Sequence, residues 1–190
     1  MKQAVLRIGA LTLLFAAVLT AANVPRPAEE LAFKLADGAE NLLSQYKGKI
    51  IAVEFLLTTC AHCQKCSQVL NKMYKEYGPK GFQPVGVAIN EMAQMFIPDY
   101  RRNFGLDFPV GYVHRDTAVQ YLQHPAMLTL MVPQLVFIDR KFTIRNQYPG
   151  GDKFFTEEEK NMREVIEGLL KEPPHGAPKK QAPPPRTKTP

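Results

Sequence analysis

Two cysteines separated by two residues stand directly after an apolar stretch of the chain. They are the ends of the run Cys60-Ala61-His62-Cys63, and the apolar stretch is residues 50–57. A buried strand followed by a helix that begins at the first cysteine lets such a pair alternate between dithiol and disulfide with little backbone movement. The type and spacing of these residues therefore predict thiol-disulfide redox chemistry.

The two cysteines are predicted to have different roles. Exposed backbone amides and the helix dipole favour an anion at a helix start, and a protonated His62 would add positive charge, so Cys60 is the candidate nucleophile. Cys63 lies one turn further along the apolar stripe and is the candidate resolving thiol. The alternative for the pair is a purely structural disulfide, although a bridge that closes so small a loop constrains little of the unfolded chain. The alternative for His62 is a solvent-facing side chain with no electronic effect.

An acidic residue interrupts the apolar stretch. Glu54 stands six residues before Cys60, and a carboxyl group inside a buried strand is costly unless it is protonated or hydrogen-bonded. We expect Glu54 to accept the proton of Cys63 during disulfide exchange. The alternative is a position at the edge of a sheet, where Glu54 reaches water.

The elements that must position these residues alternate along the chain. Residues 50–57 and 82–89 read as buried strands, and the apolar positions between them recur at helical spacing up to Gly78-Pro79. Residues 139–141 read as a hairpin turn between strands 134–138 and 142–147. A last helix follows, with Thr156 and Glu159 as a predicted capping box. The pattern predicts an α/β fold with a central mixed β-sheet flanked by helices.

Several short motifs occur in the order of one known family. They are Phe33 to Gly38, Tyr46 to Lys49, Cys60 to Cys63, Gly86 to Ile89, Phe108-Pro109-Val110 and Val132-Pro133. With these motifs, residues 28–170 resemble the exported thiol-disulfide oxidoreductases of the TlpA/ResA type, which are related to the AhpC/TSA family. The resemblance implies a thioredoxin-like fold and a cis proline at Pro133 that faces the cysteine pair. It also implies protein dithiol or disulfide substrates, a separate redox partner, and substrate binding at Val132 and Pro133.

The chain departs from that family at several positions. His62 stands where TlpA-like proteins often have proline, and a histidine there resembles disulfide-introducing and disulfide-isomerising enzymes, so the direction of exchange stays open. Cys66 stands where glutamate is common. We interpret it as a buried thiol that packs like a small apolar residue, because a disulfide to Cys63 would need local unwinding of the helix. Thr59 replaces an aromatic residue, and the apolar segment 124–131 is either a substrate groove or part of the core.

A metal carrier is the alternative function. Cys60, Cys63 and Cys66 could bind copper together with a histidine, and Met92, Met95, Met127 and Met131 suit the soft Cu(I) ion. The favoured redox function needs no metal and no cofactor other than the Cys60–Cys63 disulfide. A peroxidase of the peroxiredoxin group is excluded, because the Pro-x-x-x-Thr-x-x-Cys pattern surrounds neither Cys60 nor Cys63.

Composition and charge define three regions of the 190-residue chain. Residues 1–22 are a predicted signal peptide, with an uncleaved membrane anchor as the alternative, so we expect export to the periplasm or another extracytoplasmic space, with the inner membrane as a possible site of anchoring. Residues 28–171 are the predicted thioredoxin-like domain, expected to be a monomer. Residues 172–190 contain seven prolines and are predicted to be a disordered basic tail. The whole formal charge of +6 comes from the two ends, so the neutral middle predicts no binding of nucleic acid.

Overall fold

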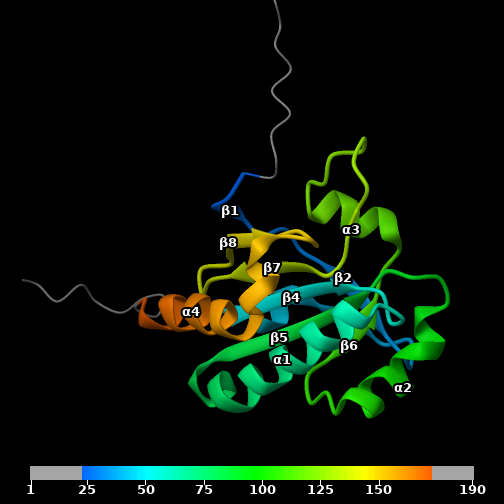
Figure 1. The fold of residues 1–190 in the computed structure, drawn as a ribbon, viewed down its shortest axis with the longest axis horizontal. Coiled ribbons are helices and arrows are strands. Elements are labelled where there is room, and N and C mark those ends of the chain that lie inside the picture. The colour runs from blue at the N-terminus through cyan, green and yellow to red at the C-terminus, as the bar shows by residue number, and fades with distance from the viewer. Residues whose placement is uncertain (1–22, 173–190) are drawn as a thin grey trace, which may run out of the picture.

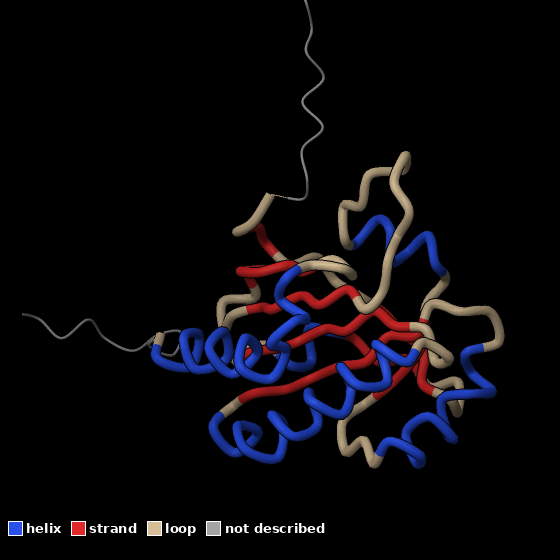
Figure 2. The backbone as a smooth tube through the Cα atoms, viewed as in Figure 1, coloured by secondary structure: helices blue, strands red, loops and turns tan. Residues whose placement is uncertain are grey.

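The computed structural model describes residues 23–172, so the predicted signal or anchor segment 1–22 and the predicted tail beyond residue 172 lie outside the described residues. The described part is a twisted mixed β-sheet with helices on both faces (Figures 1 and 2). Its elements in chain order are β1 (Arg26–Pro27), β2 (Ala32–Leu35), β3 (Glu40–Leu42), η1 (Leu43–Tyr46), β4 (Ile50–Leu56), α1 (Ala61–Tyr77), η2 (Gly78–Lys80), β5 (Phe82–Ala88), α2 (Ala93–Phe104), β6 (Val110–Tyr112), α3 (Arg115–Tyr121), β7 (Gln134–Ile138), β8 (Thr143–Tyr148), η3 (Lys153–Glu157) and α4 (Glu158–Lys171).

The sheet has eight strands in the order β1-β8-β7-β4-β5-β6-β2-β3. Strands β4, β5 and β6 run parallel, and β7 runs antiparallel to β4, so the sheet is mixed as the sequence predicted. Strand β4 is central, with Glu54 paired to Gly86 of β5 on one side and to Leu135 of β7 on the other. The residue at position 54 is therefore in the middle of the sheet.

Each face of the sheet has its own hydrophobic core. Helices α1, α2 and α4 pack on one face, where Leu70, Ile97 and Ile166 are buried together. Helix α3 packs on the other face through Ala118 and Tyr121. Because both faces are covered, all seven residues of β4 are buried, which explains why this strand is almost entirely apolar in sequence.

The predicted strands at 50–57, 82–89 and 134–138 and the hairpin turn at 139–141 are confirmed within one residue. The prediction that Thr156 and Glu159 form a capping box is wrong. The Thr156 hydroxyl donates to the carbonyl oxygen of Lys153 at 2.7 Å, within the short helix η3, whose first turn is capped by Asp152. Because η3 occupies residues 153–157, helix α4 begins at Glu158. The carboxyl group of Glu158 therefore lies against α1, where it pairs with Lys65.

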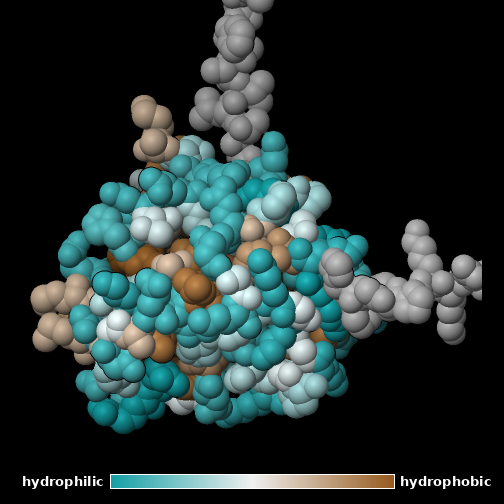
Figure 3. All heavy atoms as spheres, turned by 180° about the vertical axis from the view of Figure 1, so that it is seen from behind, coloured by the Kyte–Doolittle hydropathy of each residue, from teal (hydrophilic) through white to brown (hydrophobic). Residues whose placement is uncertain are grey.

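Some apolar side chains are exposed. On the face seen in Figure 3 they show as separate brown areas between hydrophilic side chains. Three of the most exposed, Met127, Leu128 and Met131, belong to the segment before Pro133, so the interpretation of that segment as core is wrong for these three residues. Within residues 23–172, no helix combines the length and the apolar character needed to cross a bilayer.

Candidate active site

The cysteine pair lies at the start of α1, as the sequence predicted. Cys60 is the N-cap residue with extended backbone (φ −85°, ψ 116°), and Cys63 is in the first turn of the helix. Both are free thiols in the structure, and they lie in contact with each other. Cys60 is half-buried whereas Cys63 is fully buried, so Cys60 is the thiol that a second protein can reach.

Hydrogen bonds from two neighbouring elements hold the turn that leads into α1. The side chain of Asn90, which follows β5, accepts from the backbone amide of Thr58 at 3.0 Å. The Gln64 side chain of α1 donates to the carbonyl oxygen of Thr58 at 3.1 Å, and the Cys60 amide donates to the carbonyl oxygen of Leu57 at 3.0 Å. These bonds fix the position of Cys60 relative to the sheet.

Glu54 lies beneath the cysteine pair and is fully buried. The alternative in which Glu54 reaches water at a sheet edge is therefore wrong. The Ser67 hydroxyl donates to Glu54 Oε2 at 2.6 Å, and the hydroxyl groups of Ser67 and Tyr100 are 2.8 Å apart. Glu54 Oε1 has no hydrogen-bond partner among the described residues. Burial raises the pKa of Glu54 to about 8, against the smaller lowering effect of the Ser67 hydrogen bond.

The same surroundings affect Cys63, the predicted resolving thiol. Burial raises the pKa of the Cys63 thiol well above its usual range, and the negative charge of Glu54 raises it further. A thiol of this kind needs a nearby base before it can attack a disulfide. Glu54 is suited to that role, because a pKa of about 8 makes both its protonated and its ionised forms accessible near neutral pH.

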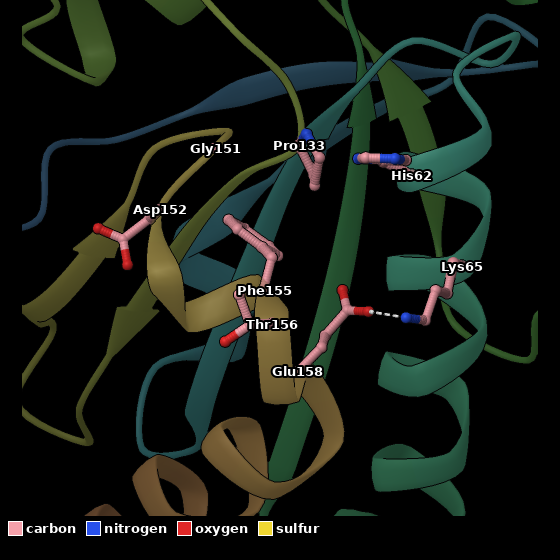
Figure 4. Close-up of a pocket in the computed structure, with 8 residues that line it drawn as sticks. All are labelled: His62, Lys65, Pro133, Gly151, Asp152, Phe155, Thr156 and Glu158. Atoms are coloured by element: carbon pink, nitrogen blue, oxygen red, sulfur yellow. Dashed lines mark ion pairs between the residues drawn. The ribbon is translucent and has the colours of Figure 1, made fainter.

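The expected cis peptide bond is present between Val132 and Pro133. Pro133 lines a cavity of about 280 Å³ beside the start of α1, together with His62, Phe155 and Glu158 (Figure 4). In that view the His62 ring and the Pro133 ring lie across the cavity from each other, and His62 is exposed. The structure thus brings His62 and Pro133, two of the predicted site residues, to the same opening. Val132, which comes directly before Pro133 in the chain, is half-buried.

The arrangement does not favour the copper alternative. Cys66 is fully buried, while Met92, Met95, Met127 and Met131 are all exposed. Across residues 23–172, no three side chains of the histidine, cysteine, aspartate or glutamate type come together as candidate metal ligands. Cys66 instead occupies the core against α4, as the interpretation of a buried thiol requires.

Sequence reasoning missed three residues of this site. Ser67 is one turn beyond Cys63 on the buried side of α1, so its helical spacing could have identified it. Tyr100 of α2 and Glu158 of α4 carry no sequence signal of this kind. They reach the site only because both helices pack on the face of the sheet that α1 covers.

Comparisons with known proteins agree with this geometry. The model of the AhpC/TSA family matches residues 24–147. The chain is 27% identical over 97 residues to the thiol-disulfide oxidoreductase ResA of Geobacillus thermodenitrificans, and 26% identical over 114 residues to ResA of Geobacillus kaustophilus. These matches cover 51% and 60% of this chain, and span 55% and 65% of the two relatives.

Solved structures show the same fold. A thiol:disulfide interchange protein of the thioredoxin family from Chlorobium tepidum superposes with a TM-score of 0.62 at 21% identity, over 79% of this chain and 99% of that one. The described residues therefore have a thioredoxin-like fold, as the resemblance implied. With a family model that matches 65% of its length, the chain belongs to the AhpC/TSA family.

Proposed function

We propose that this protein is an exported thiol-disulfide oxidoreductase that exchanges disulfides with other proteins through Cys60 and Cys63. One observation carries the proposal. A half-buried Cys60 at a helix start lies in contact with a buried Cys63, above a buried carboxyl group whose pKa is about 8. A structural disulfide would need neither the accessible thiol nor the titratable group beneath it.

The first step of the proposed reaction involves Cys60. Its thiolate attacks one sulfur of a substrate disulfide, which forms a mixed disulfide and releases the other substrate sulfur as a thiolate that takes a proton from water. Cys60 is suited to this step because it is the only one of the three cysteines whose side chain is not fully buried.

The second step involves Cys63 and Glu54. Ionised Glu54 takes the proton of the Cys63 thiol, and the resulting thiolate attacks Cys60 Sγ. The bond between Cys60 and the substrate breaks, the Cys60–Cys63 disulfide forms, and the second substrate sulfur leaves as a thiolate. In the reverse direction Glu54 returns its proton to Cys63, so one carboxyl group serves both reduction and oxidation.

Substrate binding is assigned to the cavity at the start of α1. The backbone of Val132 would pair with an extended substrate segment, and Pro133 would contact the substrate beside Cys60. His62 faces Pro133 across the opening, where its charge when protonated would favour the Cys60 thiolate (Figure 4). The reaction needs no metal and no cofactor other than the cysteine pair.

Location and partners belong to the same proposal. The apolar segment of residues 8–22 supports export to the periplasm or another extracytoplasmic space, either as a cleaved signal or as an anchor in the inner membrane. N-terminal sequencing of the mature protein and fractionation of the cells that make it distinguish the two. The partners would be protein substrates and a second redox protein that resets the cysteine pair, with this protein acting as a monomer.

Mixed-disulfide trapping tests the function. Cys63→Ser should accumulate a covalent complex between Cys60 and a substrate protein such as insulin, because the resolving step is lost. Cys60→Ser should give no complex and no turnover, and Cys66→Ala is the matched control that should resolve the complex. Equal trapping by the Cys60→Ser and Cys63→Ser variants would overturn the assigned roles.

The direction of exchange is decided by the reduction potential of the Cys60–Cys63 couple. A value near the thioredoxin potential of about −270 mV makes the protein a reductant, and a value near about −120 mV makes it an oxidant. Equilibration with glutathione or dithiothreitol buffers, read by alkylation and mass, gives this potential directly.

A further inference from the structure

The cavity at the start of α1 has an apolar side and a charged side. Phe155 and Pro133 form the apolar side, and Figure 4 shows the Phe155 ring directed from η3 toward Pro133. The carboxyl group of Glu158 also points into the cavity, toward Lys65 of α1. The cavity volume of about 280 Å³ lies at the lower end of the range of ligand pockets, which suits a single side chain of a substrate.

Glu158 carries the buried charge of this cavity. Its side chain is only 5% exposed. Among residues 23–172, the one cationic group within ion-pair distance of Glu158 is the Lys65 ammonium group, whose Nζ is 3.9 Å from Glu158 Oε2. That distance is too long for a hydrogen bond, and Lys65 is 68% exposed. A buried carboxylate with so weak a partner can accept hydrogen bonds from a donor that enters the cavity.

The positive groups of the cavity lie at its rim. Lys65 and His62 are exposed, so water screens their charges. Glu158 is shielded from water, and an opposite charge placed against it interacts more strongly than it would at the surface. Because Lys65 can turn toward solvent, a cation of the substrate can take its place beside Glu158. The cavity therefore favours a basic side chain over an acidic one.

The apolar side of the cavity is held by an aromatic cluster. The Phe155 ring packs edge-to-face on the buried ring of Phe154, with the centroids 5.5 Å apart. Phe154 stacks on Tyr148 of β8 with a centroid distance of 3.9 Å, and its amide donates to the Asp152 side chain at 2.7 Å. These contacts fix Phe155 beside Glu158. The aliphatic stem of a lysine or arginine can therefore pack on Phe155 while its charged end reaches Glu158.

The cavity also lies beside the proposed redox pair. It is lined by Pro133 and by His62, which stands between Cys60 and Cys63 in the chain. A substrate whose cysteine reacts with Cys60 therefore has the residues that flank this cysteine next to the cavity. One of these flanking side chains is the one that enters it.

We propose that the cavity is a subsite for a lysine or arginine side chain that flanks the reactive cysteine of the substrate, with Glu158 selecting the positive charge and Phe155 supporting the stem. This assignment rests on the proposed function and deepens it, because it names the class of substrate. Burial raises the pKa of Glu158, whereas the positive charges of Lys65 and His62 lower it, so a bound cation would stabilise the ionised carboxylate.

Activated peptides test the subsite whichever way the protein exchanges disulfides. Four peptides share a single cysteine, held as a 2-pyridyl disulfide, and carry lysine, arginine, norleucine or glutamate on both sides of it. Norleucine keeps the unbranched stem of lysine without its charge. In the Cys63→Ser protein, the Cys60 thiolate attacks the peptide sulfur and a mixed disulfide forms. The pyridine thiolate leaves, takes a proton from water, and is measured by the absorbance of 2-thiopyridone.

The rate constants in the Cys63→Ser background should depend on the charge of the peptide. We expect the lysine and arginine peptides to react about tenfold faster than the norleucine peptide, and the glutamate peptide to be the slowest. Adding Glu158→Gln should slow the lysine peptide to the rate of the norleucine peptide. Adding Phe155→Ala should slow the lysine, arginine and norleucine peptides alike, because all three lose the apolar support.

Glu159→Gln is the matched control. It changes the next residue of α4, whose half-exposed carboxylate pairs with Lys72 at 2.7 Å, and should keep the preference for lysine. Thermal unfolding checks that each variant is folded at the temperature of the assay.

The subsite is overturned if the lysine peptide reacts no faster than the norleucine peptide in the Cys63→Ser protein, or if its advantage survives in Glu158→Gln. Either result, with the peptides still attached to Cys60 by mass mapping, would leave the proposed function in place. Failure of every peptide to react at Cys60 would instead overturn the proposed function, and the subsite with it.

Discussion

The Ser67 hydroxyl donates a 2.6 Å hydrogen bond to Glu54 Oε2, from a position on α1 one turn beyond Cys63. This bond links the helix that carries the proposed redox pair to the strand that carries its proposed base. A second hydroxyl, that of Tyr100 on α2, lies 2.8 Å from Ser67 and extends the network to a third element. Two hydroxyl groups, from α1 and α2, therefore orient one oxygen of the Glu54 carboxyl group.

Loss of the Ser67 hydroxyl should shift the pH dependence of disulfide exchange. Ser67→Ala removes a hydrogen bond that lowers the pKa of Glu54, so Glu54 holds its proton to a higher pH and the acid limb of the rate profile moves upward. The unsatisfied carboxyl group should also cost about 1–3 kcal/mol of stability. Stopped-flow resolution of a preformed mixed disulfide across pH 5–9 measures the shift.

Tyr100→Phe is the matched control for that experiment. It removes only the outer hydroxyl and leaves the bond between Ser67 and Glu54 in place. Its profile should lie between those of the parent and Ser67→Ala. An acid limb that does not move in Ser67→Ala would contradict the role of Glu54 as the base.

The stability of the folded protein should fall as the pH rises from about 4.5 to about 8. Folding raises the pKa of Glu54 from 4.5 to about 8, so between these values the unfolded chain releases a proton that the folded protein keeps. The stability contributed by protonated Glu54 is highest below the pKa of the unfolded chain. It falls as the pH rises through the pKa of the folded protein, by up to about 5 kcal/mol.

Glu54→Gln isolates this contribution, because an amide keeps the size of the side chain and does not titrate. The difference in unfolding free energy between the variant and the parent should be smallest near pH 4.5 and should grow in favour of the variant up to pH 8. Urea unfolding of the reduced proteins at a series of pH values measures it. A difference that stays constant across this range would show that Glu54 titrates normally.

Alkylation should distinguish the three thiols. Cys60 is half-buried, whereas Cys63 and Cys66 are fully buried. Iodoacetamide should label Cys60 of the native dithiol protein at least about tenfold faster than the other two, as read by peptide mass mapping. All three should label at similar rates in guanidinium chloride. Fast native labelling of Cys63 would contradict the proposed order of attack.

A methyl group at Gly150 should displace the backbone of Met131 and Val132, which precede Pro133. A Cβ atom built there would lie 2.7 Å from the carbonyl carbon of Met131 and 2.9 Å from the amide nitrogen of Val132, and backbone atoms at these distances must move. We expect Gly150→Ala to slow disulfide exchange with insulin by about tenfold or more, because the residues before Pro133 are displaced. Kinetic constants for insulin reduction measure the effect.

Gly168→Ala provides the comparison. Its Cβ would meet nothing within 4 Å, and alanine in the middle of α4 should raise stability by about 0.5–1 kcal/mol with unchanged activity. Parental kinetics in Gly150→Ala would mean that the Met131–Val132 backbone does not contact the substrate.

The sequence by itself predicted the redox pair and the central strands of a mixed sheet. Cys60 and Cys63 are close in sequence and follow a strand, so local spacing was sufficient to predict a redox pair at a helix start. The apolar run of β4, interrupted only by Glu54, predicted a strand covered on both faces and made that acid conspicuous. Patterns of this kind can be recognised in a single sequence because they depend only on residues that are neighbours along the chain.

Only the tertiary structure decided what surrounds Glu54. Tyr100 and Glu158 lie 46 and 104 residues further along the chain than Glu54 and belong to two different helices. Nothing in the sequence around either residue indicates that its side chain lies near Glu54. The short helix η3 also moved the start of α4 to Glu158, which the capping pattern at Thr156 did not predict. The pKa of a buried acid depends on which side chains from distant elements pack around it, and that packing is fixed only when the sheet and its helices assemble.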